Sequence, residues 1–82
     1  MMDLRIELYG VLQRLAGVRD LMLELPEGAT AADALAQLQP RSAELVARLA
    51  QCACAIGDRI VTRDEPLIDG STLVLIPPVS GG

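Results

Sequence analysis

Apolar residues stand at every second position in two segments near the start of the chain. In residues 4–9 the alternating apolar residues are leucine and isoleucine, and in residues 21–25 they are all leucine. Side chains of a strand point alternately to its two faces, so a period of two predicts strands with one buried face. Residues 10–17, between the two segments, have apolar positions at helical spacing between two glycines and predict a short helix.

The most hydrophobic run of the chain is residues 72–76, which follow a turn at Asp69-Gly70. A strand that is apolar on both faces is typical of the middle of a sheet. We expect this strand to lie beside the first one, in the centre of the sheet. The chain beyond residue 76 would then be held at its root by the best-buried strand.

Two helices are predicted between these strands. Thr30 followed three residues later by Asp33 has the spacing of a capping box, which predicts a helix over residues 31–39. Ser42 is expected to cap a second short helix that carries one apolar stripe and ends near Leu49.

A hairpin is predicted after the second helix. Residues 52–56 and 59–61 are strand-like, and Gly57-Asp58 between them is the two-residue loop of a type II′ turn. The order of strands and helices indicates an α+β domain over residues 1–76, with a mixed sheet of four to five strands and helices packed on one face.

Composition excludes several functions. The chain has no histidine, so it cannot form a Ser-His or Cys-His nucleophile pair, and it also lacks lysine. The chain has seven arginines against eleven acidic residues, so its net charge is negative. Tyr9 is the only aromatic residue on which a base could stack. We therefore expect no nucleic acid as a partner. No apolar run reaches the roughly 20 residues of a membrane span and no signal peptide is evident, which predicts a cytoplasmic protein without membrane contact.

Some surface residues allow two interpretations each. Leu67 and Ile68 either form an exposed apolar patch or close the edge of the core. Arg5, Arg59 and Arg63 either contact acidic groups of a partner or are simply solvated.

Cysteine appears twice, at Cys52 and Cys54 in an apolar stretch. Two positions apart on a strand, both thiols point to the same face, and we expect them to be buried structural residues. The sequence offers no further ligands for a metal at this place, so none is expected.

The last six residues form a tail with a stiff start and a slim end: Pro77, Pro78, Val79, Ser80, Gly81 and Gly82. Proline has a fixed φ angle, and glycine has no side chain, so such a tail can enter a channel as narrow as the backbone. The α-carboxyl group of Gly82 would then be the reactive group. From the glycines alone, a frayed terminus without a function stays equally open.

Taken in order, the short helix at 12–17, the capped helix at Thr30, the segment Pro66–Leu73 and the ending Pro-Pro-Val-Ser-Gly-Gly resemble the molybdopterin synthase small-subunit family. These are ubiquitin-like β-grasp sulfur carriers, related to the thiazole-forming sulfur carrier and the ubiquitin-related modifier. The resemblance covers essentially the whole chain. It implies a β-grasp fold over residues 1–76 and a flexible C-terminal tail over 77–82.

The resemblance also implies a chemistry. An E1-like adenylating enzyme would use ATP to join the Gly82 carboxylate to AMP, and a sulfur donor would convert it to a thiocarboxylate. Inside the large subunit of molybdopterin synthase, in a heterotetramer, this sulfur would pass to cyclic pyranopterin monophosphate during molybdenum cofactor biosynthesis. Pro77, Pro78, Val79, Ser80 and Gly81 would be the partner-binding part of the tail. The chain itself would bind no cofactor or metal and would not be an enzyme on its own.

Two alternatives stay open at this point. The sulfur carried on Gly82 could go to another acceptor, in cysteine synthesis, thiamine synthesis or tRNA thiolation. The chain could also be a ubiquitin-like modifier, attached through its tail to lysines of other proteins.

Overall fold

Two strands from opposite ends of the chain lie side by side in the middle of the sheet. In the computed structural model, which describes residues 1–38 and 43–78, β1 (Met2–Leu8) runs parallel to β5 (Thr72–Ile76). β5 is also paired on its other side, antiparallel to β3 (Ala53–Ile56). The predicted central position of residues 72–76 beside the first strand is therefore confirmed.

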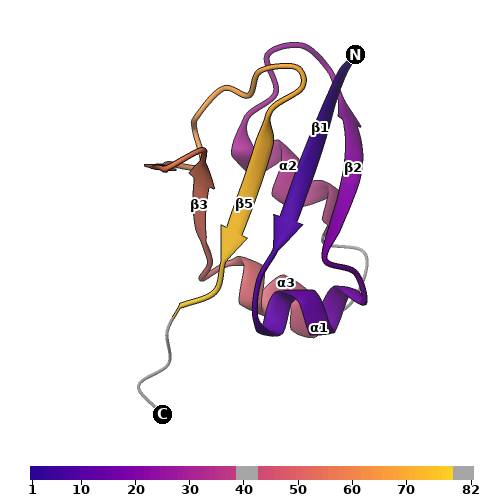
Figure 1. Cartoon of the computed structure of the whole chain (residues 1–82), viewed down its shortest axis with the longest axis vertical. Coiled ribbons are helices and arrows are strands. Elements are labelled where there is room, and N and C mark those ends of the chain that lie inside the picture. The colour runs from indigo at the N-terminus through magenta and orange to yellow at the C-terminus, as the bar shows by residue number, and fades with distance from the viewer. Residues whose placement is uncertain (39–42, 79–82) are drawn as a thin grey trace.

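The described residues form a five-stranded sheet in the order β2-β1-β5-β3-β4. Figure 1 shows α2 lying across one face of the sheet, and α1 and α3 lying at the end where β1 and β5 finish. The predicted α+β class is confirmed. The elements not yet given are α1 (Val11–Ala16), β2 (Asp20–Leu25), α2 (Ala31–Leu38), α3 (Ala43–Leu49) and β4 (Arg59–Val61).

The core lies between the sheet and the helices and is aliphatic. Alternate residues of β1 point inward and are at most 3% exposed, as the period of two predicts. Leu73 and Leu75 of β5 add to this layer, and the helices cover it with leucines and alanines. Burial of one leucine side chain stabilises a fold by about 1.5–3 kcal/mol, so this layer accounts for much of the stability of a small domain.

Local signals in the sequence act as predicted. The backbone N–H of Thr30 donates to Asp33 Oδ2 over 2.8 Å, and the N–H of Asp33 donates to Thr30 Oγ1 over 3.4 Å, which completes the capping box. Gly57 has φ 64°, while no non-glycine residue of the described ranges has a positive φ. This combination at Gly57-Asp58 fits a type II′ turn and not a type I′ turn. The proposed cap Ser42 lies outside the described residues.

Three details of the prediction need correction. The first strand covers Met2–Leu8 rather than residues 4–9, because Met2 is also buried and pairs with Leu25. β3 begins one residue after Cys52. β5 is not the best-buried strand, because no helix of the described ranges covers its outer side and Ile76 is 37% exposed, whereas four residues of β1 are at most 3% exposed.

The two cysteines are both buried, as predicted. The Cys52 thiol donates to the carbonyl oxygen of Leu49 over 3.3 Å. A hydrogen bond with Cys54, together with burial, raises the pKa of Cys52, and the same hydrogen bond lowers the pKa of Cys54 to about 7. In the ranges that the structure covers, no helix is long and apolar enough to cross a bilayer.

Candidate functional site

The tail predicted to carry the function begins where the central strand ends. β5 finishes at Ile76, and Pro77 and Pro78 continue the chain away from the sheet at the end that holds α1 and α3 (Figure 1). The remaining site residues of the prediction, Val79, Ser80, Gly81 and Gly82, lie outside the described residues. Their roles stay predictions.

The start of α1 lies directly against the root of the tail. A Cβ atom added to Gly10 would lie 3.1 Å from Cγ of Pro77, closer than side chains normally approach. Gly10 precedes α1 with φ 57° and ψ −131°, a backbone conformation that glycine adopts readily and other residues do not. Glycine at this position therefore allows Pro77 to pack against the backbone of the β1–α1 connection.

A hollow of about 540 Å³ opens beside the two prolines. Its walls come from three parts of the chain that are distant in sequence: α1, the end of α3 and the tail root. The residues that line it are Val11, Arg14, Arg48, Gln51, Pro77 and Pro78.

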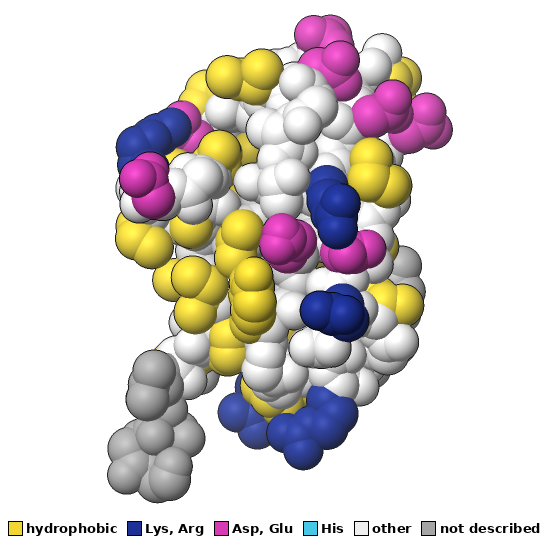
Figure 2. Space-filling view, viewed as in Figure 1, with side chains coloured by type: hydrophobic (Ala, Val, Ile, Leu, Met, Phe, Trp, Pro, Cys, Tyr) yellow, Lys and Arg dark blue, Asp and Glu magenta, His cyan; other side chains and the backbone are white. Residues whose placement is uncertain are grey.

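An apolar surface lies on the open face of the sheet and leads to the tail. Five small or aliphatic residues that share this face, which we call the outer patch, form it: Ala53, Ala55, Ile60, Val74 and Ile76, of which Ala55 is only 6% exposed. The pairing of the strands places these residues in two adjacent rows, because Ala55 lies opposite both Val74 and Ile60, and Ala53 lies opposite Ile76. Figure 2 shows hydrophobic side chains gathered over β5 and β3, next to the point where the tail leaves.

Exposure of the outer patch is unusual for residues of this kind. Ile60 is 66% exposed and Ile76 is 37% exposed, although both are aliphatic. A contiguous apolar surface on a small protein is typical of a site that binds another protein. The sequence prediction missed this patch. The signal was present in β5, whose apolar residues occupy both faces of a sheet that has helices on only one.

The residues predicted as possible surface contacts differ in burial and in their partners. Leu67 is 4% exposed and belongs to the core, whereas Ile68 is 74% exposed, so the two do not form one patch. All three arginines named with them have partners within the chain. Arg5 pairs with Asp20 over 2.8 Å, Arg59 pairs with Glu65 over 3.2 Å, and Arg63 donates to backbone carbonyl groups.

Chemically, the described residues can dock a partner and present a tail. Within them, no group of three or more acidic or cysteine side chains is arranged to hold a metal ion. The outer patch reaches the root of the tail at Ile76, which directly precedes Pro77. The described geometry places an apolar surface of the sheet directly beside the root of the tail.

Comparison with known proteins agrees with this geometry. The model of the ThiS family matches residues 6–82, which includes the whole tail. The molybdopterin synthase sulfur carrier subunit of Chlamydomonas reinhardtii is 31% identical over 83 residues, which cover 99% of this chain and all of that protein.

Two solved structures are similar over nearly their full length. SAMP1 of Haloferax volcanii has a TM-score of 0.84 at 26% identity, over 98% of this chain and 99% of that one. One chain of the Helicobacter pylori complex of subunits 1 and 2 of molybdopterin-converting factor has a TM-score of 0.72 at 26% identity. The match covers 99% of this chain and 100% of that one. The β-grasp, ubiquitin-like fold expected from the sequence is thereby confirmed, and the chain belongs to the ThiS family.

Proposed function

We propose that the chain is the sulfur-carrier subunit of a molybdopterin synthase. The observation that carries this proposal is the match of the ThiS family model through residue 82, which includes the diglycine of the tail. The similarity over full length to the sulfur carrier subunit of Chlamydomonas reinhardtii supports the choice of this pathway.

The proposed chemistry takes place at the α-carboxyl group of Gly82. A carboxylate is a poor electrophile, so an adenylating enzyme first transfers AMP to it from ATP, with release of pyrophosphate. Sulfide from a sulfur donor then attacks the acyl carbon and displaces AMP, which leaves a thiocarboxylate. Glycine at positions 81 and 82 leaves the acyl carbon open to attack and keeps the tail narrow.

A thiocarboxylate is ionised at neutral pH, and the anionic form of sulfur is the nucleophile. In this proposal the sulfur attacks a side-chain carbon of cyclic pyranopterin monophosphate in the large subunit and displaces an oxygen substituent from it. Water then hydrolyses the thioester so formed, which leaves the sulfur on the pterin and returns Gly82 to a carboxylate. Two such transfers supply the two sulfurs of the dithiolene. The chain binds no cofactor itself, and its partners supply the catalytic residues.

The fold supports this role because it holds the root of the tail firmly. β5 is paired on both sides, and its inward residues Leu73 and Leu75 are at most 1% exposed. Pro77 and Pro78 follow directly and limit the directions that the tail can take. In our proposal Val79 and Ser80 contact the walls of the partner's channel.

The proposed partners are the large subunit of the synthase and an E1-like adenylating enzyme. The Helicobacter pylori structure contains subunits 1 and 2 of molybdopterin-converting factor, which supports a large subunit as partner for this chain. We propose that the outer patch docks on the large subunit while the tail enters it. This assembly is expected in the cytoplasm, as a heterotetramer of two small and two large subunits.

The test is a mass measurement on the intact chain. Incubation with the adenylating enzyme, ATP and a sulfide source should raise the mass by about 16 Da, as one terminal oxygen is replaced by sulfur. Omission of ATP is the control, and both deletion of Gly82 and addition of one alanine after it should prevent the shift. A chain whose mass stays unchanged, while a known carrier is converted in the same mixture, contradicts the proposal.

A modifier function is the second candidate, and the similarity to SAMP1, a small archaeal modifier protein, favours it. Activated Gly82 would then form isopeptide bonds with lysines of other proteins. The chain has no lysine, so products would carry single copies and not chains linked through its own side chains. Isopeptide-linked products in cells without a detectable thiocarboxylate would support this candidate over the first.

A further inference from the structure

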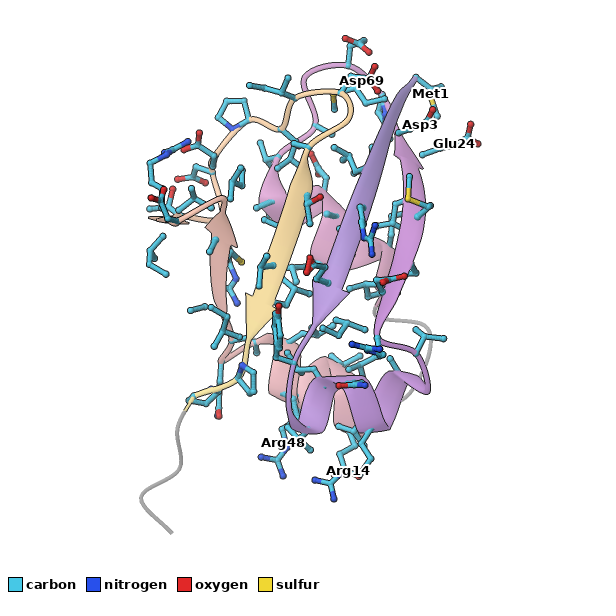
Figure 3. The ribbon with its side chains drawn as sticks, in the orientation of Figure 1. Met1, Asp3, Arg14, Glu24, Arg48 and Asp69 are labelled. Atoms are coloured by element: carbon cyan, nitrogen blue, oxygen red, sulfur yellow. The ribbon has the colours of Figure 1, made fainter. Side chains whose placement is uncertain are left out.

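Two arginines stand at the end of the molecule from which the tail leaves. Arg14 is in the last turn of α1 and Arg48 is in the last turn of α3. Figure 3 shows both side chains pointing outward at this same end. With Pro77 and Pro78 they line the hollow of about 540 Å³ described above.

Neither arginine has an ion pair or side-chain hydrogen bond within residues 1–38 and 43–78. Arg5, Arg59 and Arg63, by contrast, all have partners, and Arg19, which has none among the described residues, does not line this hollow. Arg48 follows Glu44 by four residues, a spacing at which a helix can form an ion pair, yet the two do not pair.

Favourable interaction with the helix dipole explains a basic residue in the last turn of a helix, at about 0.3–1 kcal/mol each. It does not explain why two separate helices direct their arginines to one place. That placement follows from the packing of α1 on α3, which lie together at the end of the sheet from which the tail leaves (Figure 1).

The opposite end of the molecule is acidic. Asp3, Glu24 and Asp69 lie there, far from Arg14 and Arg48 (Figure 3). The chain as a whole has a net charge of −4, so the end that carries Arg14 and Arg48 is opposite in sign to the whole molecule. Such separation of charge orients a protein as it approaches a charged partner.

We propose that Arg14 and Arg48 bind carboxylate groups on the rim of the channel in the adenylating enzyme that takes up the tail. This inference rests on the proposed function and adds the chemistry of the partner's surface. The partner must carry Asp or Glu side chains around the entrance, because a guanidinium group binds a carboxylate through paired, charge-assisted hydrogen bonds. The acidic end of the chain disfavours the reverse approach.

The reach of the tail argues for the channel rim over the nucleotide. Four residues separate Pro78 from the end of Gly82, and an extended segment of this length spans about 13 Å. A phosphate of ATP at the carboxylate would therefore lie too far from arginines at the tail root. Nucleic acid is a poor fit as well, because two cations on a chain of net charge −4 release few counterions.

The experiment compares charge reversals that change the net charge equally. Arg14→Glu and Arg48→Glu are tested against Arg59→Glu, an arginine that is exposed and lies on β4. Thermal unfolding first establishes that all three variants fold. The rate of adenylation by the enzyme with ATP is then measured from low to saturating concentrations of the chain, which gives both kcat/KM and kcat. The series is run in low salt and in about 1 M salt, where the Debye length is ~3 Å.

Arg14→Glu and Arg48→Glu should each lower kcat/KM at low salt about tenfold relative to Arg59→Glu, with kcat at saturation unchanged, because rim charges act mainly on association. The difference should disappear in high salt. Equal kcat/KM for the three variants overturns the inference while leaving the proposed function intact. Loss of binding to single-stranded RNA in the two variants, with adenylation unaffected, overturns it in favour of nucleic acid. If the unchanged chain is not adenylated at all, the proposed function itself fails.

Discussion

The guanidinium group of Arg63 donates a hydrogen bond to the carbonyl oxygen of Leu49 over 2.7 Å and another to the carbonyl oxygen of Cys52 over 3.1 Å. Leu49 is the last residue of α3, where carbonyl groups lack partners within the helix. Arg63 therefore closes the end of α3 from the loop after β4. The same helix end carries Arg48 and Gln51, which line the hollow beside the tail.

Replacement of Arg63 by alanine should destabilise the fold. Loss of hydrogen bonds from a charged donor costs about 1.5–3 kcal/mol, because the two carbonyl groups are left with poorer partners. Arg59→Ala is the matched control, since its pair with Glu65 is exposed and contributes about 0–1 kcal/mol. Urea unfolding measures both. Equal losses of unfolding free energy would show that Arg63 does not hold the end of α3.

The contact between Gly10 and Pro77 predicts a second effect on stability. Alanine at Gly10 must adopt φ 57° and ψ −131° and also meets the ring of Pro77, which together should cost about 1–3 kcal/mol. Gly17→Ala is the control: Gly17 has φ 80° and ψ 5°, with no atom within 4 Å of an added Cβ. It should cost about 1–2 kcal/mol from backbone strain alone.

A double-mutant cycle separates strain from contact at this position. Pro77→Ala removes the ring, so it should recover part of the loss in the Gly10→Ala background. Unfolding free energies of the four proteins give the coupling. Additive effects would contradict a contact between the start of α1 and the tail root.

Sequence reasoning succeeded for features that depend on neighbours along the chain. The alternation in β1 and β2, the capping box at Thr30 and the turn at Gly57 each need only a few adjacent residues, and the structure contains all of them. The central position of β5 followed from its hydrophobicity. The tail chemistry came from the family resemblance, and its outer residues lie beyond the described ranges.

Features that combine distant segments could not be predicted in the same way. The outer patch depends on the order of strands, because Ile60 joins it only through pairing with Ala55. Arg14 and Arg48 are 34 positions apart in the sequence and line the same hollow only because α1 packs on α3. Arg63 was treated as a surface charge, since its bonds to backbone carbonyl groups have no signature in the sequence.

The outer patch predicts that one exposed isoleucine matters for binding and another does not. Ile60→Ala should weaken binding to the large subunit about tenfold, because Ile60 is the most exposed large side chain of the patch and loss of a buried interface contact can cost more than about 1 kcal/mol. Ile68→Ala is the control, because Ile68 is as exposed, at 74% against 66%, and lies outside the patch. Titration calorimetry with the large subunit measures both affinities, and unfolding experiments establish that both variants fold. Equal affinities would place the docking surface elsewhere.

The two faces of β5 predict opposite consequences for adjacent residues. Leu75 is fully buried, so Leu75→Ala leaves a cavity and should cost about 2–5 kcal/mol of unfolding free energy. Val74 points to the open face, where truncation to alanine leaves no cavity and should cost less than about 1 kcal/mol. Binding should show the reverse order at a temperature where both variants are folded: Val74→Ala weakens association with the large subunit, and Leu75→Ala leaves it nearly unchanged. Urea unfolding and calorimetry on the same two proteins test both expectations. If Val74→Ala were neutral in binding, the open face of β5 would not contact the large subunit, and the root of the tail would have to be positioned by other surfaces.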